Sequence, residues 1–153
     1  MTSAKVLAYD VVSYANERRY KVTNLKLQKM MYYLQGYYAK QFEDALFEDE
    51  IVCWPYGPVV PMVYFEFCQF GASEIQIAPV DQPFAGRSHQ EKRFLCQIVD
   101  ACLKLPASVL VEKTHNESPW KMAREREIIP FPSIKAFFST NDPLEIMTKK
   151  VRE

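Results

Sequence analysis

The chain has 153 residues, of which 48% are hydrophobic and 25% charged, and its nineteen basic residues balance nineteen acidic ones. This composition predicts one globular domain that buries a core, and zero net charge excludes a global field that draws the chain to nucleic acid or anionic membranes. The N-terminus has no signal-peptide pattern and no apolar run approaches the roughly 18 residues of a membrane span, so we expect a cytoplasmic protein.

Apolar residues at helical spacing predict the first two helices. The first spans residues 3–17. The second begins at a cap supplied by Thr23 or Asn24. Gly36 within it is about 1 kcal/mol less favourable than alanine, and we interpret it as the mark of a close helix contact. The apolar stripe of this second helix is the clearest in the chain: Leu27, Met30, Met31, Leu34 and Tyr38.

Tyrosines and lysines occupy the remaining positions of this second helix. An amphipathic helix buries one face, so we expect Lys26 and Lys29 to lie on a solvated face. Tyr32 and Tyr33 lie off the apolar stripe. They either belong to a surface patch for a partner or pack in the core with the hydroxyl reaching water, and the second reading is favoured.

A proline-rich segment, residues 54–61, follows a short predicted strand at residues 51–54. Its prolines, which lack an N–H donor, indicate a stiff turn outside any regular ladder, and Gly57 allows a positive φ. Pro61 can begin a helix that Gly71 ends. Alternating residues 73–78 predict a second short strand, which can pair with the first as a small ribbon.

The second half of the chain reads as a series of short helices. Ser88 and Glu91 form a capping box for a helix that Pro106 ends. Further helices are expected at 107–114, at 118–126 with Ser118 as the cap, from Ser133, and from 141–143. We therefore predict a mainly α, compact, single-domain bundle (residues 1–153) of about six or seven helices with a short two-stranded ribbon, in which residues 140–153 form a helical tail.

Few residues suggest chemistry. The four cysteines form no Cys-x-x-Cys pair, which favours reduced core thiols, and the histidines His89 and His115 have no carboxylate at metal-binding spacing. The glycines form no phosphate-binding motif, so we expect neither a metal nor a cofactor. Nothing near Cys53 or Cys102 lowers a thiol pKa, and we expect no enzyme. A Cys/His hydrolase using His115 and Glu117 is the lesser alternative.

Charge distribution suggests a second alternative. Six basic residues and no acidic one lie between Arg18 and Lys40, interleaved with tyrosines as in single-strand binders. An acidic segment, residues 43–50, follows directly. The chain is therefore a dipole, and nucleic-acid binding is a minor reading.

Three blocks in order carry a family resemblance: TNLKLQKMMYYLQG at residues 23–36, WPYGPVVPMVY at 54–64 and HNESPW at 115–120. They resemble the Panacea antitoxin domain family, also called SocA-like or GepA-type, over residues 2–138. The positions that match its motif, for which a structural role is implied, are Leu27, Gln28, Gly36, Gly57, Pro58, His115, Glu117, Pro119 and Trp120.

The resemblance implies a mostly helical domain of bacteria and their phages that neutralises a toxin by direct, stoichiometric binding, the toxin being encoded by the adjacent gene. One branch instead delivers its toxin to the ClpXP protease. The match begins almost at Met1, so we expect no DNA-binding extension. Interfaces of this kind depend on a few aromatic and basic anchors. The candidate partner-binding residues are Lys29, Tyr33, Trp54, Tyr56 and Tyr64.

Overall fold

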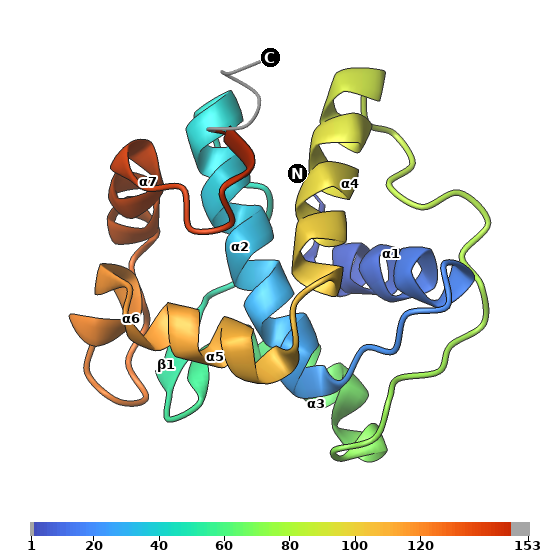
Figure 1. Ribbon diagram of the computed structural model, residues 1–153, viewed down its shortest axis with the longest axis horizontal. Helices are drawn as coiled ribbons and strands as arrows, with labels where there is room; N and C mark the ends of the chain where they lie inside the picture. The colour runs from blue at the N-terminus through green and yellow to red at the C-terminus, as the bar shows by residue number, and fades with distance from the viewer. Residues whose placement is uncertain (1, 148–153) are drawn as a thin grey trace.

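One central helix organises the fold. The computed structural model describes residues 2–147, and within this range six further α-helices and one hairpin are arranged about helix α2 (Figure 1). The predicted helical bundle with a short ribbon is confirmed. The elements are α1 (Ala4–Glu17), α2 (Asn24–Phe42), β1 (Val52–Trp54), β2 (Gly57–Val59), α3 (Pro61–Phe67), a 3-10 turn (Cys68–Phe70), α4 (His89–Leu103), α5 (Ala107–His115), α6 (Ser118–Lys121) and α7 (Phe131–Thr140).

Side-chain caps begin three of these helices where the sequence predicts them. The hydroxyls of Ser3, Thr23 and Ser88 accept hydrogen bonds from the third backbone N–H that follows each. Each bond satisfies one of the N–H groups that a helix start leaves without a partner. The ambiguity at the start of α2 is thereby resolved in favour of Thr23.

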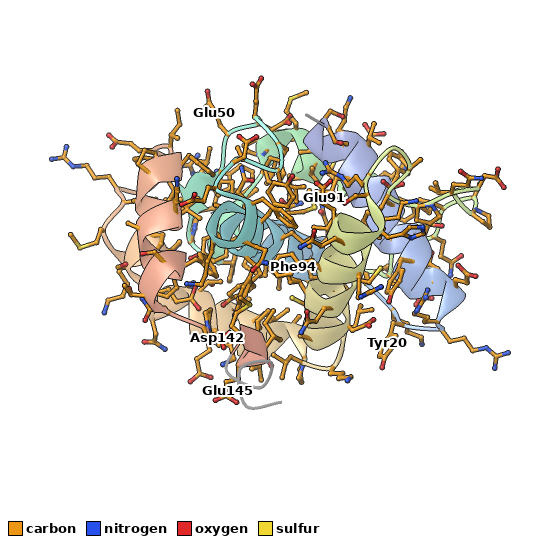
Figure 2. All side chains as sticks on the ribbon, turned by 90° about the horizontal axis from the view of Figure 1, so that it is seen from above. Tyr20, Glu50, Glu91, Phe94, Asp142 and Glu145 are labelled. Atoms are coloured by element: carbon orange, nitrogen blue, oxygen red, sulfur yellow. The ribbon has the colours of Figure 1, made fainter. Side chains whose placement is uncertain are left out.

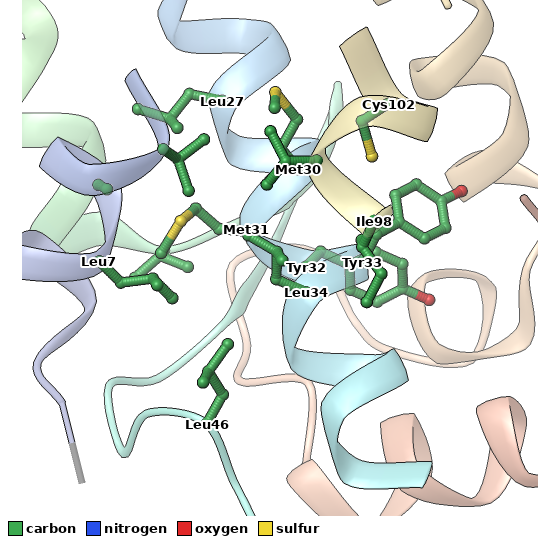
Figure 3. Close-up of a cluster of buried hydrophobic side chains, with 14 of the residues drawn as sticks. Leu7, Leu27, Met30, Met31, Tyr32, Tyr33, Leu34, Leu46, Ile98 and Cys102 are labelled. Atoms are coloured by element: carbon green, nitrogen blue, oxygen red, sulfur yellow. The ribbon is translucent and has the colours of Figure 1, made fainter. Parts of the chain in front are cut away.

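Helix α2 is buried on all sides along most of its length, which corrects the expectation of one solvated face, although Leu25 in its first turn is 41% exposed. It contacts α1, α3, α4, α5, α7 and β2, and Figure 2 shows it nearly end-on in the middle of the molecule. In Figure 3, Met31 points toward Leu7 of α1, while the rings of Tyr32 and Tyr33 lie on the other side of the helix. Both tyrosines are fully buried, so they form core and not a surface patch.

The polar side chains of α2 are buried because each meets the backbone of a neighbouring segment. Lys26 Nζ donates to the carbonyls of Leu103 and Leu105 at the end of α4. Gln35 donates to Phe47 O and accepts from Leu46 N. A buried polar group is tolerated when it is hydrogen-bonded, so these residues hold α4 and the 46–47 segment against α2. The prediction that Lys26 is solvated is wrong.

The proline-rich segment forms the second strand of the hairpin, which corrects two expectations. Strand β1 pairs antiparallel with β2, and Cys53 lies opposite Pro58. The backbone N–H and C=O of Cys53 bond instead to Glu127 and Arg126 on its other side. Antiparallel pairs alternate between bonded and non-bonded positions, so a proline fits opposite Cys53 without loss of a ladder bond.

Residues 73–78 do not form the predicted partner strand. Only a single bridge joins Glu74 to Thr23, and Ile75 N donates to Val22 O. Ile75 is buried while Gln76 is exposed, so the alternation of the segment reflects packing of an extended chain at the N-terminus of α2.

Helix boundaries differ from prediction after residue 117. Helix α6 ends at Lys121 because the following chain turns, with Arg126 at a φ of 70°, to bond with β1. Helix α7 begins at Phe131 with Pro132 in its first turn, where a missing N–H is tolerated, and not after Ser133. Residues 148–153 of the expected helical tail lie outside the described residues.

The close contact expected at Gly36 is present. A Cβ added to Gly36 would meet the ring of Phe138, which inserts from α7 against α2. The same ring packs edge-on against Tyr32 and Tyr33. Gly36 therefore sets the approach of α7.

Candidate functional site: an aromatic groove beside helix α2

The N-terminal part of α2 forms the floor of a cavity, and its polar side chains hold the opposite wall. Gln28 donates to Asn24 Oδ1 and accepts from Val60 N at 2.9 Å. Asn24 in turn donates to Tyr64 O. This chain of bonds ties the segment between β2 and α3 to α2 and fixes where the aromatic side chains of that segment lie.

Lys29 lies beneath this floor. Its side chain is fully buried, and Nζ donates to Pro58 O at 3.1 Å. Burial lowers the pKa of Lys29 to about 7, because a charged ammonium is disfavoured away from water. A Cβ at Gly57 would meet Lys29 Cε at 2.5 Å, and Gly57 has a φ of 121°, so glycine is required by both space and conformation.

Three aromatic rings pack together along one side, and two of them, Trp54 and Tyr64, line the cavity. Trp54 lies 5.0 Å from Tyr64 and 6.4 Å from Phe65 between ring centroids, and Tyr64 lies 5.4 Å from Phe65. All three pairs are edge-to-face, the geometry that aromatic quadrupoles favour. Trp120 Nε1 donates to Trp54 O at 2.8 Å and so anchors β1 from behind.

Together these elements surround a cavity of about 550 Å³ that opens to solvent, here called the aromatic groove. Tyr56, at the tip of the hairpin, is 68% exposed beside it. The residues that line the groove come from α2, the hairpin, α3 and two loops: Asn24, Leu25, Gln28, Lys29, Trp54, Pro55, Tyr56, Val59, Tyr64, Gly71, Ala72 and Arg126. A cavity of this size and mostly apolar lining is typical of a binding site.

The structure brings together four of the five candidate partner-binding residues. Trp54, Tyr56 and Tyr64 line the groove with at least part of each side chain exposed, and Lys29 lies below them. Tyr33 is elsewhere, fully buried against Glu117. Because Lys29 and Tyr33 are fully buried, neither can be a surface anchor in this conformation, which corrects that part of the prediction.

Sequence reasoning missed two apolar residues that extend the groove. Phe65 is 64% exposed and Met62 54% exposed on the outer face of α3, while Val63 and Phe67 on its inner face are buried. The sequence of α3 could have revealed them, because apolar residues lie on two faces of this short helix and only one face can pack against the core. Arg126 was also missed, because it reaches the groove from a loop distant in sequence.

The third motif block forms a structural contact behind the groove. His115 ends α5, and its ring stacks on Trp120 with a centroid distance of 4.1 Å. Glu117 precedes α6 and accepts hydrogen bonds from the hydroxyls of Tyr32 and Tyr33. Burial raises the pKa of Glu117 to about 7, although the two tyrosine bonds oppose this change.

The remaining motif positions surround these contacts. Leu27, Pro58 and Pro119 are buried, the first in α2, the second in β2 and the third in the first turn of α6.

The thiols are poor candidates for nucleophiles. Burial raises the pKa of Cys102 to about 12 and also raises the pKa of Cys53, so the reactive thiolate is disfavoured at both. Between residues 2 and 147, no three side chains of His, Cys, Asp or Glu are placed to hold a metal ion. In the same range no single helix is long and apolar enough to cross a membrane. Helices α4 and α5 reach that length and apolarity only when taken together, and they are bent by 104° relative to one another.

Comparison with known proteins gives one match. The family model described as "Antitoxin SocA-like, Panacea domain" matches residues 27–121, more than half of the chain. This range runs from within α2 through the hairpin to the end of α6 and includes nine of the twelve residues that line the aromatic groove, all except Asn24, Leu25 and Arg126. No curated protein and no solved structure gives a significant match.

Proposed function

The chain belongs to the SocA-like Panacea antitoxin family, and we propose that it neutralises a partner toxin by binding it directly through the aromatic groove. The observation that carries the proposal is the gathering of the exposed Tyr56 and Phe65 and the partly exposed Trp54 at and beside one apolar cavity. Large apolar side chains gathered on the surface of a soluble domain mark interaction sites.

The chemistry of these residues suits stoichiometric binding. Tryptophan and tyrosine supply large contact areas at little loss of conformational entropy, and they dominate the energetics of protein interfaces. The groove is held by buried hydrogen bonds from Asn24 and Gln28, so its wall is ordered before a partner arrives. A preorganised surface loses less entropy on binding and gives higher affinity. Neither buried thiol has the low pKa that a cysteine nucleophile needs, and we propose a role without turnover.

The partner we propose is the product of the adjacent gene. That product is first expressed alone to establish that it arrests growth, and is then co-expressed with the antitoxin. We expect restored growth and a complex that purifies at a fixed stoichiometry. A chain in which Tyr56 and Phe65 are both alanine serves as the groove variant, and Met122→Ala, which changes an 83% exposed side chain outside the groove, serves as the matched control.

Each other outcome contradicts part of the proposal. Rescue without a complex, lost in cells that lack ClpXP, would indicate delivery of the toxin to a protease. Rescue that the groove variant retains in full would place the binding surface elsewhere. Growth arrest that the wild-type antitoxin does not relieve would remove this toxin as the partner.

A further inference from the structure

The aromatic groove is unevenly charged. Two of its lining residues, Lys29 and Arg126, are cationic, and none is acidic. This imbalance stands out because the whole chain carries equal numbers of acidic and basic residues. A cleft with low-dielectric walls focuses the field of such charges toward its interior.

Lys29 carries only part of a positive charge at neutral pH, because burial lowers its pKa to about 7. The pKa of Lys29 is lowered by burial alone, with no opposing contribution from an acidic neighbour. Its one hydrogen bond in the described structure goes to Pro58 O, which leaves two ammonium hydrogens without a protein acceptor. Lys29 lines the groove without any exposed area, so its effect on a bound ligand acts mainly through its electric field.

The walls and mouth add polar donors that no protein group occupies. Within residues 2–147, the guanidinium of Arg126, the indole N–H of Trp54 and the hydroxyls of Tyr56 and Tyr64 form no hydrogen bond to another protein group, and all four side chains are at least partly exposed. Arg126 is exposed, and its backbone is fixed by the bond from its N–H to Cys53 O. Donors and positive charge that converge on an apolar cavity favour an anionic acceptor.

We infer that the aromatic groove takes a segment of the toxin in which a large apolar side chain stands next to a carboxylate. The apolar side chain fills the space between Trp54, Tyr56 and Tyr64, and the carboxylate pairs with Arg126 above the buried Lys29. The exposed Met62 and Phe65 continue the apolar surface outside the groove, which favours a protein segment over a small molecule. This inference rests on the proposed function and adds the chemistry of the partner.

A library of random dodecapeptides displayed on phage tests this chemistry without the toxin. Three immobilised proteins are compared: wild type, Arg126→Glu, and Arg124→Glu as a matched control on the same loop that does not line the groove. We expect wild type and Arg124→Glu to enrich peptides with Asp or Glu beside Trp, Phe or Leu. With Arg126→Glu the acidic residue should be lost from the enriched peptides. Enrichment by wild type of apolar peptides without an acid, or of none, overturns the inference.

The toxin then separates this inference from the proposed function. An enriched peptide should compete with the toxin for wild-type antitoxin, and Arg126→Glu should weaken toxin binding at least tenfold while Arg124→Glu changes it less than twofold. Equal loss in both variants, or in neither, overturns the acidic recognition although the toxin still binds. If the groove variant described above keeps full affinity for the toxin, the proposed function fails independently of the peptide result.

Discussion

Tyr33 and Glu117 are 84 residues apart in sequence, and the Tyr33 hydroxyl donates to Glu117 Oε2 at 2.7 Å inside the core. Tyr32, the preceding residue, donates to Oε1 of the same carboxylate at 3.0 Å. Two consecutive residues of α2 thus hold the segment that begins α6. Since β1 is anchored from α6 by Trp120, this pair also supports the wall of the aromatic groove.

Replacing Tyr33 by phenylalanine tests the strength of this contact. At pH 8 Glu117 is mostly ionised, so Tyr33→Phe should lower the free energy of unfolding by about 1.5–3 kcal/mol, the range for hydrogen bonds to charged groups. At pH 5.5 the carboxyl is protonated and the loss should fall to about 1 kcal/mol. Urea unfolding at both pH values measures the difference. Tyr20→Phe, at an exposed position, is the control and should change the free energy of unfolding by less than about 0.5 kcal/mol. An equal effect of Tyr33→Phe at both pH values would contradict the hydrogen bond to an ionised Glu117.

The sequence predicts the helices well because their signals are local. Periodic apolar residues locate α1, and with the caps at Thr23 and Ser88 they locate α2 and α4 nearly to the residue. What local signals cannot reveal is that α2 lies at the centre. Lys29 was expected on a solvated face, and the tyrosine hydroxyls were expected to reach water, because their acceptors, the Pro58 carbonyl and Glu117, are distant in sequence.

Strand pairing and helix ends failed for the same reason. Pro58 is compatible with a hairpin only because Cys53 directs its backbone groups to residues 126 and 127, which no local rule anticipates. The site was found in part, since Trp54, Tyr56 and Tyr64 belong to one unusual segment. Arg126 and the outer face of α3 required the tertiary arrangement.

Gly36→Ala is expected to destabilise the protein although alanine is the better helix former. The helix-propensity gain is about 1 kcal/mol, but the new methyl group would overlap the Phe138 ring, and overpacking costs typically about 1–3 kcal/mol. We expect a net loss of stability in thermal or urea unfolding. In a Phe138→Leu background, where the ring is absent, the same change should be neutral or stabilising. A double-mutant cycle measures this coupling, and additive effects would contradict the contact.

Stability should pass through a minimum near pH 7. Glu117 has a pKa of about 7 in the fold against 4.5 in the unfolded chain, so between these values the folded state holds the extra proton and stability falls as pH rises. Lys29 has a pKa of about 7 in the fold against 10.5 unfolded, so above pH 7 the unfolded state holds the extra proton and stability rises with pH. Urea unfolding from pH 5 to pH 9.5 should show a fall and then a rise in the free energy of unfolding, each of about 2 kcal/mol or more.

Two variants separate the fall from the rise. Glu117→Gln should remove most of the fall between pH 5 and pH 7 and keep the rise above pH 7. Lys29→Met, of similar length and without charge, should do the reverse. A curve in which either substitution leaves its own part of the pH dependence unchanged would assign that part to other groups.

Tyr56→Ala should separate binding from stability. Tyr56 is 68% exposed at the tip of the hairpin, so its truncation should change the free energy of unfolding by less than about 0.5 kcal/mol. If Tyr56 anchors the toxin at the groove, the same truncation should weaken binding by about 2 kcal/mol, or roughly 30-fold, as for a central interface aromatic. Isothermal titration with purified toxin gives the affinity, and Met122→Ala, which removes a still more exposed apolar side chain outside the groove, should leave it within twofold. Because neither substitution should change stability much, a loss of toxin affinity confined to Tyr56→Ala would come from the removed side chain. Equal affinities of the two variants would indicate that the toxin does not bind at this groove.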